Sequence, residues 1–258
     1  MLAVVTSAAA QSVEVSPLRV ELAMGKGASH TQAVTLTNQG SEPVRIRARL
    51  QDWYMAKDGT PQFDAPIPEG ERPFLAASWL RVAPPEQIVQ PGQQGIVRFT
   101  TTTPADAADA GYRAAILFEF GAVNADPVAA RRSVQFRSRV ATLVYMNLGK
   151  IAPSIELADL ASRARPGQPP AIVATMRNTG RSNVRTKGSV TLRDSGGQLV
   201  RTIEVPNVPL LPLAERELSI PTAKPGETAL AAGTYRVEIK IDVGAPELLV
   251  GETTMTVR

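Results

Sequence analysis

An all-β protein of two β-sandwiches is the fold that this sequence predicts, on two observations. Apolar and polar residues alternate with the period of two that half-buried strands require, and almost no segment keeps the helical period over a useful length. A segment also occurs twice, with its copies 140 residues apart (178 minus 38). The shared residues are Asn38, Gly40, Val44 and Arg45, followed by Asn178, Gly180, Val184 and Arg185. A duplicated sandwich leaves this trace, so we predict two tandem immunoglobulin-like domains.

Each copy is followed by a strand that begins with glycine, tyrosine and arginine. The first such start is Gly111-Tyr112-Arg113-Ala114, and the second is Gly233-Thr234-Tyr235-Arg236. Both tyrosines resemble the tyrosine-corner residues of these sandwiches, whose hydroxyl fastens a nearby loop.

The length of 258 residues suits two sandwiches, each large enough to bury a core. The short segment Gly149–Pro153 is the expected connection, and a connection this tight should fix the two domains at a defined angle. The predicted division is a signal-peptide remnant at 1–10, a first sandwich at 11–149 and a second at 150–258.

The first domain opens with a strand from Val13 to Leu22 that Pro17 interrupts. Proline has no N–H, so it belongs at a sheet edge or where a strand passes from one sheet to the other. In the strand Val44–Trp53, one face carries Val44, Ile46, Ala48 and Leu50, and the other carries Arg45, Arg47 and Arg49. Residues Tyr54–Pro73 are rich in turn residues and predict a long irregular excursion. Further strands are expected at Ala33–Thr37, Ser78–Val82, Gly95–Thr101, Tyr112–Phe120 and Arg132–Leu148.

The second domain continues the strand pattern. Ser195-Gly196-Gly197 predicts a hairpin turn, and Arg165–Pro170 predicts a stiff loop. Strands are expected at Ser154–Leu160, Ala171–Asn178, Lys187–Asp194, Leu199–Glu204, Arg216–Pro221, Gly233–Val243 and Glu247–Arg258.

Composition excludes several classes of site. There is no Cys, so disulfides and thiolate metal sites cannot form, and the single His30 cannot build a multi-histidine metal centre. No Gly-x-Ser-x-Gly elbow or phosphate-binding glycine loop is present, so we expect neither enzyme activity nor a cofactor or metal. The net charge of +4 comes with scattered arginines and 5% aromatic residues, which does not indicate nucleic-acid binding.

The first ten residues are apolar and small, and they end in an Ala-x-Ala signal ahead of Gln11. This pattern is typical of a secretory signal peptide cleaved after Ala10, although a disordered N-terminus is the alternative. No other apolar run has the length of a membrane span. We therefore expect an exported protein.

A family resemblance appears in the order of motifs between residues 13 and 148. The series is Ser16-Pro17-Leu18-Arg19-Val20, Thr37-Asn38, the strand into Trp53, Ser78-Trp79-Leu80-Arg81-Val82-Ala83-Pro84-Pro85, Ile88-Val89-Gln90-Pro91-Gly92, Val97-Arg98-Phe99 and Tyr112-Arg113-Ala114-Ala115-Ile116-Leu117-Phe118. This order resembles the N-terminal domain of PapD-like periplasmic chaperones of the chaperone–usher pilus pathway. The resemblance implies an L-shaped pair of sandwiches, which the second domain fits without a motif of its own.

The resemblance also implies a mechanism. Pilus subunits of that pathway lack a strand, and the chaperone lends the last strand of its first domain to fill the groove. In that family, two basic residues in the cleft between the domains bind the subunit's C-terminal carboxylate. Arg19 matches the first of these positions. The second falls on the uncharged Thr142, counting back from Tyr145, so Arg139 is the remaining candidate if the strand carries a bulge.

The donated edge strand implied by the resemblance contains Ser133, Val134, Gln135, Phe136, Arg137, Val140 and Thr142. Val134, Phe136 and Val140 share one face, whereas the register counted from Tyr145 turns the polar Gln135 outward instead. A shift of one residue exchanges the faces, so both alternatives stay open.

The function implied is a periplasmic chaperone that binds incomplete pilus or fimbrial subunits by strand donation and assists their assembly. Its partners would be the subunit and an outer-membrane usher. The alternative is a structural or adhesive exported double-sandwich protein of a surface assembly. The uncharged Thr142 and the polar Gln135 and Arg137 favour this alternative.

Overall fold

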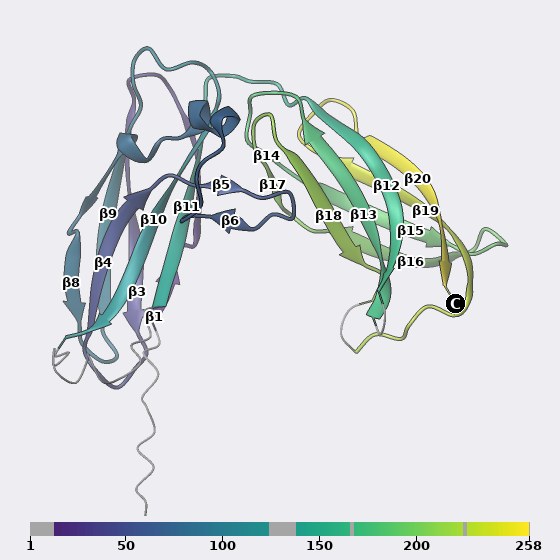
Figure 1. The fold of residues 1–258 in the computed structure, drawn as a ribbon, viewed down its shortest axis with the longest axis horizontal. Helices are drawn as coiled ribbons and strands as arrows, with labels where there is room; N and C mark the ends of the chain where they lie inside the picture. Colours follow the sequence, from purple (N-terminus) through teal and green to yellow (C-terminus); the bar gives the residue numbers. More distant parts are fainter. Residues whose placement is uncertain (1–12, 124–137, 166–167, 224–225, 258) are drawn as a thin grey trace, which may run out of the picture. The chain divides into compact units, whose positions relative to one another are not determined.

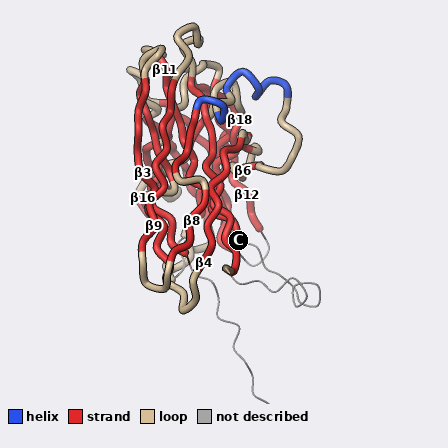
Figure 2. The backbone as a smooth tube through the Cα atoms, turned by 90° about the vertical axis from the view of Figure 1, so that its left-hand side faces the viewer, coloured by secondary structure: helices blue, strands red, loops and turns tan. Residues whose placement is uncertain are grey.

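The structure is a computed structural model that describes residues 13–123, 138–165, 168–223 and 226–257. Strands make up nearly all of its regular structure (Figure 2). The helices of the described residues are two short 3-10 segments, η1 (Glu69–Phe74) and η2 (Ala77–Trp79). The all-β class is therefore confirmed. Neither helix is long and apolar enough to cross a membrane.

The chain divides into two compact units, each a β-sandwich. The first sandwich holds the described parts of residues 1–53, 75–108 and 112–146, and the second those of 54–74, 109–111 and 147–258. A single cut after Gly149 is what the sequence predicts. The division differs because residues 54–74 precede that cut in the sequence and yet pack within the second unit.

The first sandwich consists of two sheets (Figure 1), with the orders β1-β3-β9-β7 and β2-β11-β10-β4-β8. Its strands are β1 (Val13–Ser16), β2 (Arg19–Met24), β3 (Ser29–Asn38), β4 (Val44–Gln51), β7 (Leu80–Ala83), β8 (Glu86–Val89), β9 (Gln94–Thr102), β10 (Gly111–Ala122) and β11 (Ser138–Leu148). Leu36, Ile46, Phe99 and Ile116 are fully buried in its core. The apolar face expected for the Val44 strand is confirmed, because Ile46 is buried and Arg47 is exposed.

The second sandwich has sheets of the orders β12-β13-β18 and β16-β15-β19-β20, with a small sheet β14-β17. Its strands are β12 (Ile155–Arg165), β13 (Gln168–Asn178), β14 (Val184–Arg185), β15 (Lys187–Arg193), β16 (Leu199–Val205), β17 (Pro209–Leu210), β18 (Glu215–Pro221), β19 (Gly233–Asp242) and β20 (Leu249–Val257). Ile172, Val190, Leu192 and Ile239 belong to one fully buried cluster. The unit also contains a two-stranded hairpin, β5 (Tyr54–Met55) and β6 (Pro61–Gln62).

Pro17 marks a strand switch, as the sequence predicts. Before it, β1 pairs with β3 in one sheet, with Val15 opposite Leu36. After it, β2 lies next to β11 in the other sheet. The chain therefore crosses between the two sheets at Pro17, where proline's missing N–H interrupts no ladder.

The first copy of the repeated turn is organised by Asn38, which is almost fully buried. Its Nδ2 donates to the carbonyl oxygens of Glu42 at 2.8 Å and Val89 at 3.0 Å. Its Oδ1 accepts from the N–H of Gly40 at 3.0 Å. One amide thus satisfies three backbone groups at the end of β3.

The second copy repeats these contacts. Asn178 Nδ2 donates to the carbonyl oxygens of Ser182 at 2.9 Å and Leu210 at 3.2 Å, and its Oδ1 accepts from Gly180 N–H at 3.0 Å. The repeat found in the sequence is therefore also a repeat of hydrogen bonds.

The spacing between equivalent residues changes along the repeat. It is 140 at Asn38 and Asn178 (178 minus 38), but 121 at their acceptors Val89 and Leu210 (210 minus 89). The first copy is thus 19 residues longer over this stretch (140 minus 121). The excursion Tyr54–Phe74 is 21 residues long (74 minus 54, plus 1), which is enough to account for the difference, and we interpret it as an insertion in the first copy.

Both tyrosine corners are confirmed. Tyr112 Oη donates to the carbonyl oxygen of Ala108 at 2.9 Å, and Tyr235 Oη donates to that of Ala231 at 2.8 Å. Each phenol is nearly buried and fastens the loop that leads into its own strand.

Three local predictions differ from the structure. Residues Glu86–Val89 form β8, a strand that the sequence analysis does not predict, because they extend the sheet by pairing with β4. The stiff loop expected at Arg165–Pro170 is shorter, since β12 continues to Arg165 and β13 begins at Gln168. The irregular excursion contains the β5–β6 hairpin and η1.

Candidate functional site at a strand switch

The strand switch is held in place from β11. Thr142 Oγ1 donates to the carbonyl oxygen of Pro17 at 2.8 Å, and Leu143 N–H donates to that of Leu18 at 2.9 Å. These two consecutive bonds fix the start of β2 against β11. Arg19, the first residue of β2, therefore has a defined position beside β11.

Arg19 is exposed on the surface of the first sandwich. Its Nε lies 3.3 Å from Glu21 Oε1, and the two side chains are 52% and 46% exposed. An ion pair this exposed contributes little, because water and salt screen it. The neighbouring Leu18 is 56% exposed. The switch thus presents a cation and an apolar side chain together.

Thr142 does not lie on a donated face in this structure. It is fully buried, and its hydroxyl is committed to Pro17. Burial alternates along β11, with Val144 and Met146 also buried on the side of Thr142. The side chain of Thr142 therefore points inward and fastens the switch, and its place in a donated strand stays a prediction.

Arg139 and Val140 follow Ser138 at the start of the described part of β11. Arg139 is exposed and Val140 is half-buried. By the alternation of the strand, Val140 shares the inward side of Thr142, whereas Arg139 lies on the opposite side. The residues predicted between Ser133 and Arg137 lie outside the described residues.

Strand β11 has a neighbour on each side, β10 and β2. In the part of the chain that the structure describes, the outermost strand of this sheet at that end is β2 rather than β11. Where β2 lies beside it, β11 is therefore not an outer strand of this sheet. The switch itself causes this, because it carries the chain from β1 into the second sheet. Donation of the segment that begins at Ser133 stays a prediction.

A buried arginine near β11 is a feature that the sequence analysis does not single out as functional. Arg113, in β10, is fully buried, and its Nε donates to the carbonyl oxygen of Trp53 at 2.9 Å. Its Cζ lies 5.9 Å from the centre of the Trp53 ring, a cation–π distance. Tyr145 of β11 meets the same indole edge-on, with ring centres 5.8 Å apart. The sequence signal is an arginine directly before the apolar run Ala114–Phe118.

Some charged groups elsewhere in the described residues are paired. Two guanidinium groups, Arg47 and Arg45, donate to Glu86 and hold the pKa of that carboxyl below its usual value. Lys240 lowers the pKa of Glu238 in the second sandwich. Among the described residues, no group of three or more His, Asp or Glu side chains could hold a metal ion.

The sequence matches no family model and no curated protein. Solved structures similar to the chain include a chaperone–tip adhesin complex of CFA/I fimbriae biogenesis, 15% identical over 94% of this chain and 98% of the other, with a TM-score of 0.48. The class 5 fimbriae chaperone CfaA is 15% identical over 94% and 99%, with a TM-score of 0.46. The CupB2 chaperone of Pseudomonas aeruginosa is 13% identical over 95% and 100%, with a TM-score of 0.44. Fimbrial chaperones of the PapD-like type recur among these similar structures.

Proposed function

We propose that this protein is a periplasmic, PapD-like chaperone that binds incomplete pilus or fimbrial subunits by strand donation and assists their assembly. The observation that carries the proposal is the strand switch at Pro17, which sets the exposed Arg19 directly beside β11. The order of motifs in the sequence supports the same function. An outer-membrane usher is the further partner that this role requires.

The proposed binding step follows from backbone chemistry. A sandwich that lacks a strand exposes apolar side chains and unpaired N–H and C=O groups, and an added strand satisfies both. The segment that begins at Ser133 and enters β11 would supply the strand. Its alternate side chains would then fill the subunit's groove.

Arg19 is the proposed anchor for the subunit's terminal carboxylate. A guanidinium binds a carboxylate through two parallel, charge-assisted hydrogen bonds. Exchanging Glu21 for the subunit carboxylate costs little, because the existing pair is half exposed. Arg139 is the proposed second cation, since it is exposed and Thr142 is buried and uncharged.

The test is co-expression with a pilus-type subunit encoded beside this protein, followed by measurement of the subunit recovered with it. Arg19→Ala should lower recovery about tenfold, the loss expected for one charge-assisted contact. Arg98→Ala is the matched control, because Arg98 is also exposed but lies on β9 of the other sheet. Phe136→Asp, with Ile96→Asp as its control, tests the donated segment. Unchanged recovery in both Arg19→Ala and Phe136→Asp would contradict the mechanism.

A second candidate, a structural or adhesive component of a surface assembly, is favoured by one observation. Thr142 stands where the resemblance places the second cation, and its hydroxyl donates to Pro17 inside the sandwich. Under this alternative the purified protein would form oligomers through its own sheet edges, and no subunit would depend on it for survival. Sedimentation of the purified protein distinguishes the two functions.

A further inference from the structure

The two sandwiches differ at one sheet edge. In the first, β9 is covered by β7, with Leu80 opposite Thr101. Strand β18 is the counterpart of β9, because each follows the residue whose carbonyl accepts the N–H of the repeated asparagine, Gln93 for Asn38 and Ala214 for Asn178. In its sheet as described, β18 is the last strand and has no counterpart of β7.

The outer edge of β18 offers a short row of backbone groups. Successive residues of a strand direct their N–H groups alternately to the two sides. Glu217 N–H donates outward, to the carbonyl oxygen of Lys57 at 2.8 Å, so Glu215 and Ser219 face the same way. Pro221 occupies the next outward position and has no N–H. The edge that remains to be covered is therefore centred on Glu217.

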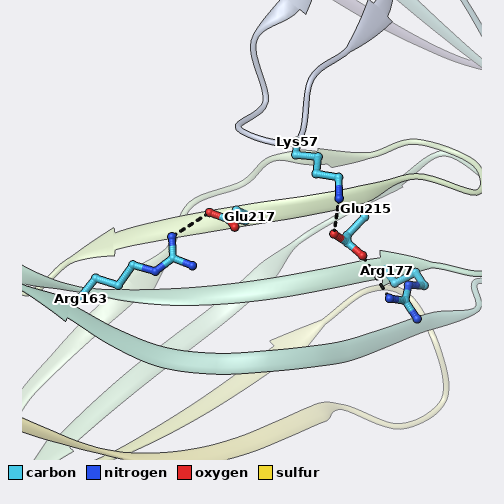
Figure 3. A network of polar contacts seen from close by, with 5 residues as sticks. All are labelled: Lys57, Arg163, Arg177, Glu215 and Glu217. Carbon is cyan, nitrogen blue, oxygen red and sulfur yellow. Dashed lines mark hydrogen bonds and ion pairs between the residues drawn. The ribbon is translucent and has the colours of Figure 1, made fainter. Parts of the chain in front are cut away.

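The tip of the β5–β6 hairpin covers this centre (Figure 3). Besides the backbone bond, Lys57 Nζ lies 2.9 Å from Glu215 Oε1, and Arg177 holds the other oxygen of that carboxylate at 3.1 Å. Arg163 pairs with Glu217 at 3.1 Å on the same surface. The lysine of the hairpin thus completes a row of alternating charges.

Glycine is required at the tip of the hairpin. Gly59 has a φ of +89°, and an added Cβ would collide with the guanidinium of Arg216. That guanidinium cannot move away freely, because its Nη1 donates to Pro209 O at 2.8 Å and to Met55 Sδ at 3.0 Å. The turn is preformed, since Ala56 N–H donates to Thr60 O at 3.0 Å. The shape of the tip therefore fits β18 only with glycine at position 59.

We infer that the hairpin Tyr54–Gln62 is an edge guard, which takes on β18 the role that β7 takes on β9. An uncovered edge pairs readily with an identical edge of another copy, and proteins prevent this with covers, charges and proline. All three are present here, in the hairpin, in Glu215 and Glu217, and in Pro221. The insertion in the first copy of the repeat thus keeps two copies of the chain from pairing through β18. This role is independent of subunit binding.

The guard is tested by undocking the hairpin in the full-length protein. Lys57→Glu places a third acid beside Glu215 and Glu217, and Lys150→Glu is the control with the same change of charge on an exposed loop. We expect Lys57→Glu to speed hydrogen exchange at the Glu217 amide about tenfold or more, because its bond to the hairpin opens. Sedimentation should then show self-association at concentrations where the control is monomeric.

Gly59→Ala undocks the hairpin without changing charge. Its control is Gly92→Ala, because Gly92 also has a positive φ, +70°, but open space around it. Adding Glu217→Thr to Gly59→Ala also removes a negative charge from the edge of β18, and this double variant should self-associate more strongly. Fast exchange at residue 217 with strictly monomeric protein in all these variants would overturn the guard. Unchanged exchange at the Glu217 amide in both single variants would overturn the docking itself.

Discussion

Arg113 and Arg236 occupy the same place in the two sandwiches, one residue after a tyrosine corner, and their surroundings are opposite. Arg113 is fully buried against Trp53. Arg236 is 66% exposed and pairs with Glu252 at 2.7 Å. The same strand position is thus solvated in the second sandwich and covered in the first. A repeat preserves backbone and core, whereas the outer face of each sheet is free to diverge.

The buried asparagine turns and tyrosine corners, in contrast, are alike in the two sandwiches. Asn38 and Asn178 each bond two carbonyl oxygens and one glycine N–H, with distances that agree within a few tenths of an ångström. Both tyrosine corners reach a carbonyl four residues earlier. These groups are buried, and a buried carbonyl without a donor is costly, so the geometry is retained.

The largest expected effect separates the two arginines. Arg113→Ala should lower the free energy of unfolding of the first sandwich by about 3–5 kcal/mol, because a buried carbonyl loses its donor and a cavity opens. Urea unfolding followed by tryptophan fluorescence measures this directly, since both tryptophans of the chain, Trp53 and Trp79, belong to the first sandwich.

Arg236→Ala is the comparison for that measurement. Its side chain is mostly in water, so circular dichroism should show almost no shift of the unfolding transition of the second sandwich. Equal destabilisation by the two substitutions would mean that their surroundings are alike, against the structure.

A smaller and symmetric effect is expected from the two asparagines. Asn38→Ala and Asn178→Ala should each cost about 2–4 kcal/mol, because each leaves two backbone carbonyls without a donor. The losses should fall on different sandwiches, which the fluorescence and dichroism transitions distinguish. Asn207→Ala is a control, since Asn207 is exposed. A clearly unequal pair would show that only one copy of the turn depends on its asparagine.

The smallest effect is a pH dependence of the hairpin. Hydrogen bonds from Lys57, and then from Arg177, hold the pKa of Glu215 below its ordinary value of 4.5. A lowered pKa means that the ion pairs contribute fully above pH 4.5 and are lost as the pH falls through the folded value. The pKa of Asp58, in the hairpin turn, is also lowered, by hydrogen bonds from Thr60 and by Arg216, and acts in the same direction.

The measurement is exchange at the Glu217 amide between pH 3 and 6, corrected for the intrinsic rate. Protection should decrease below pH 4.5, whereas the amide of Val190, inside β15, should keep its protection. Constant protection of the Glu217 amide over this range would show that the backbone bond to Lys57 holds without the ion pair.

Much of the fold could be predicted because its signals are local. Proline at position 17 marks a strand switch through its missing N–H, and the pattern around Asn38 recurs around Asn178. Strand β8 was not predicted, because its four residues lie between the turn residues Pro84-Pro85 and Gln90-Pro91-Gly92. They form a strand by pairing with β4. Local chemistry thus predicts switches and turns, and tertiary pairing decides short edge strands.

The candidate site was harder to predict because it depends on which way side chains point. The resemblance places the second cation at Thr142, and the structure shows an uncharged side chain that is fully buried there. Which face of the strand a residue lies on depends on its register, which a shift of one residue reverses. Lys57 and Glu217 are 160 residues apart (217 minus 57), so no sequence window contains their contact. Arg19 is the part of the site that sequence reasoning did place on an exposed strand after the switch.

Hydrogen exchange of the complex with a co-expressed pilus-type subunit tests the central claim most directly. If the margin beside the switch binds the subunit, protection should rise on complex formation at the start of β11 and at β2, and should stay unchanged on β15 and β19 of the second sandwich. A complex that forms with no added protection at β2 and β11 would contradict the account.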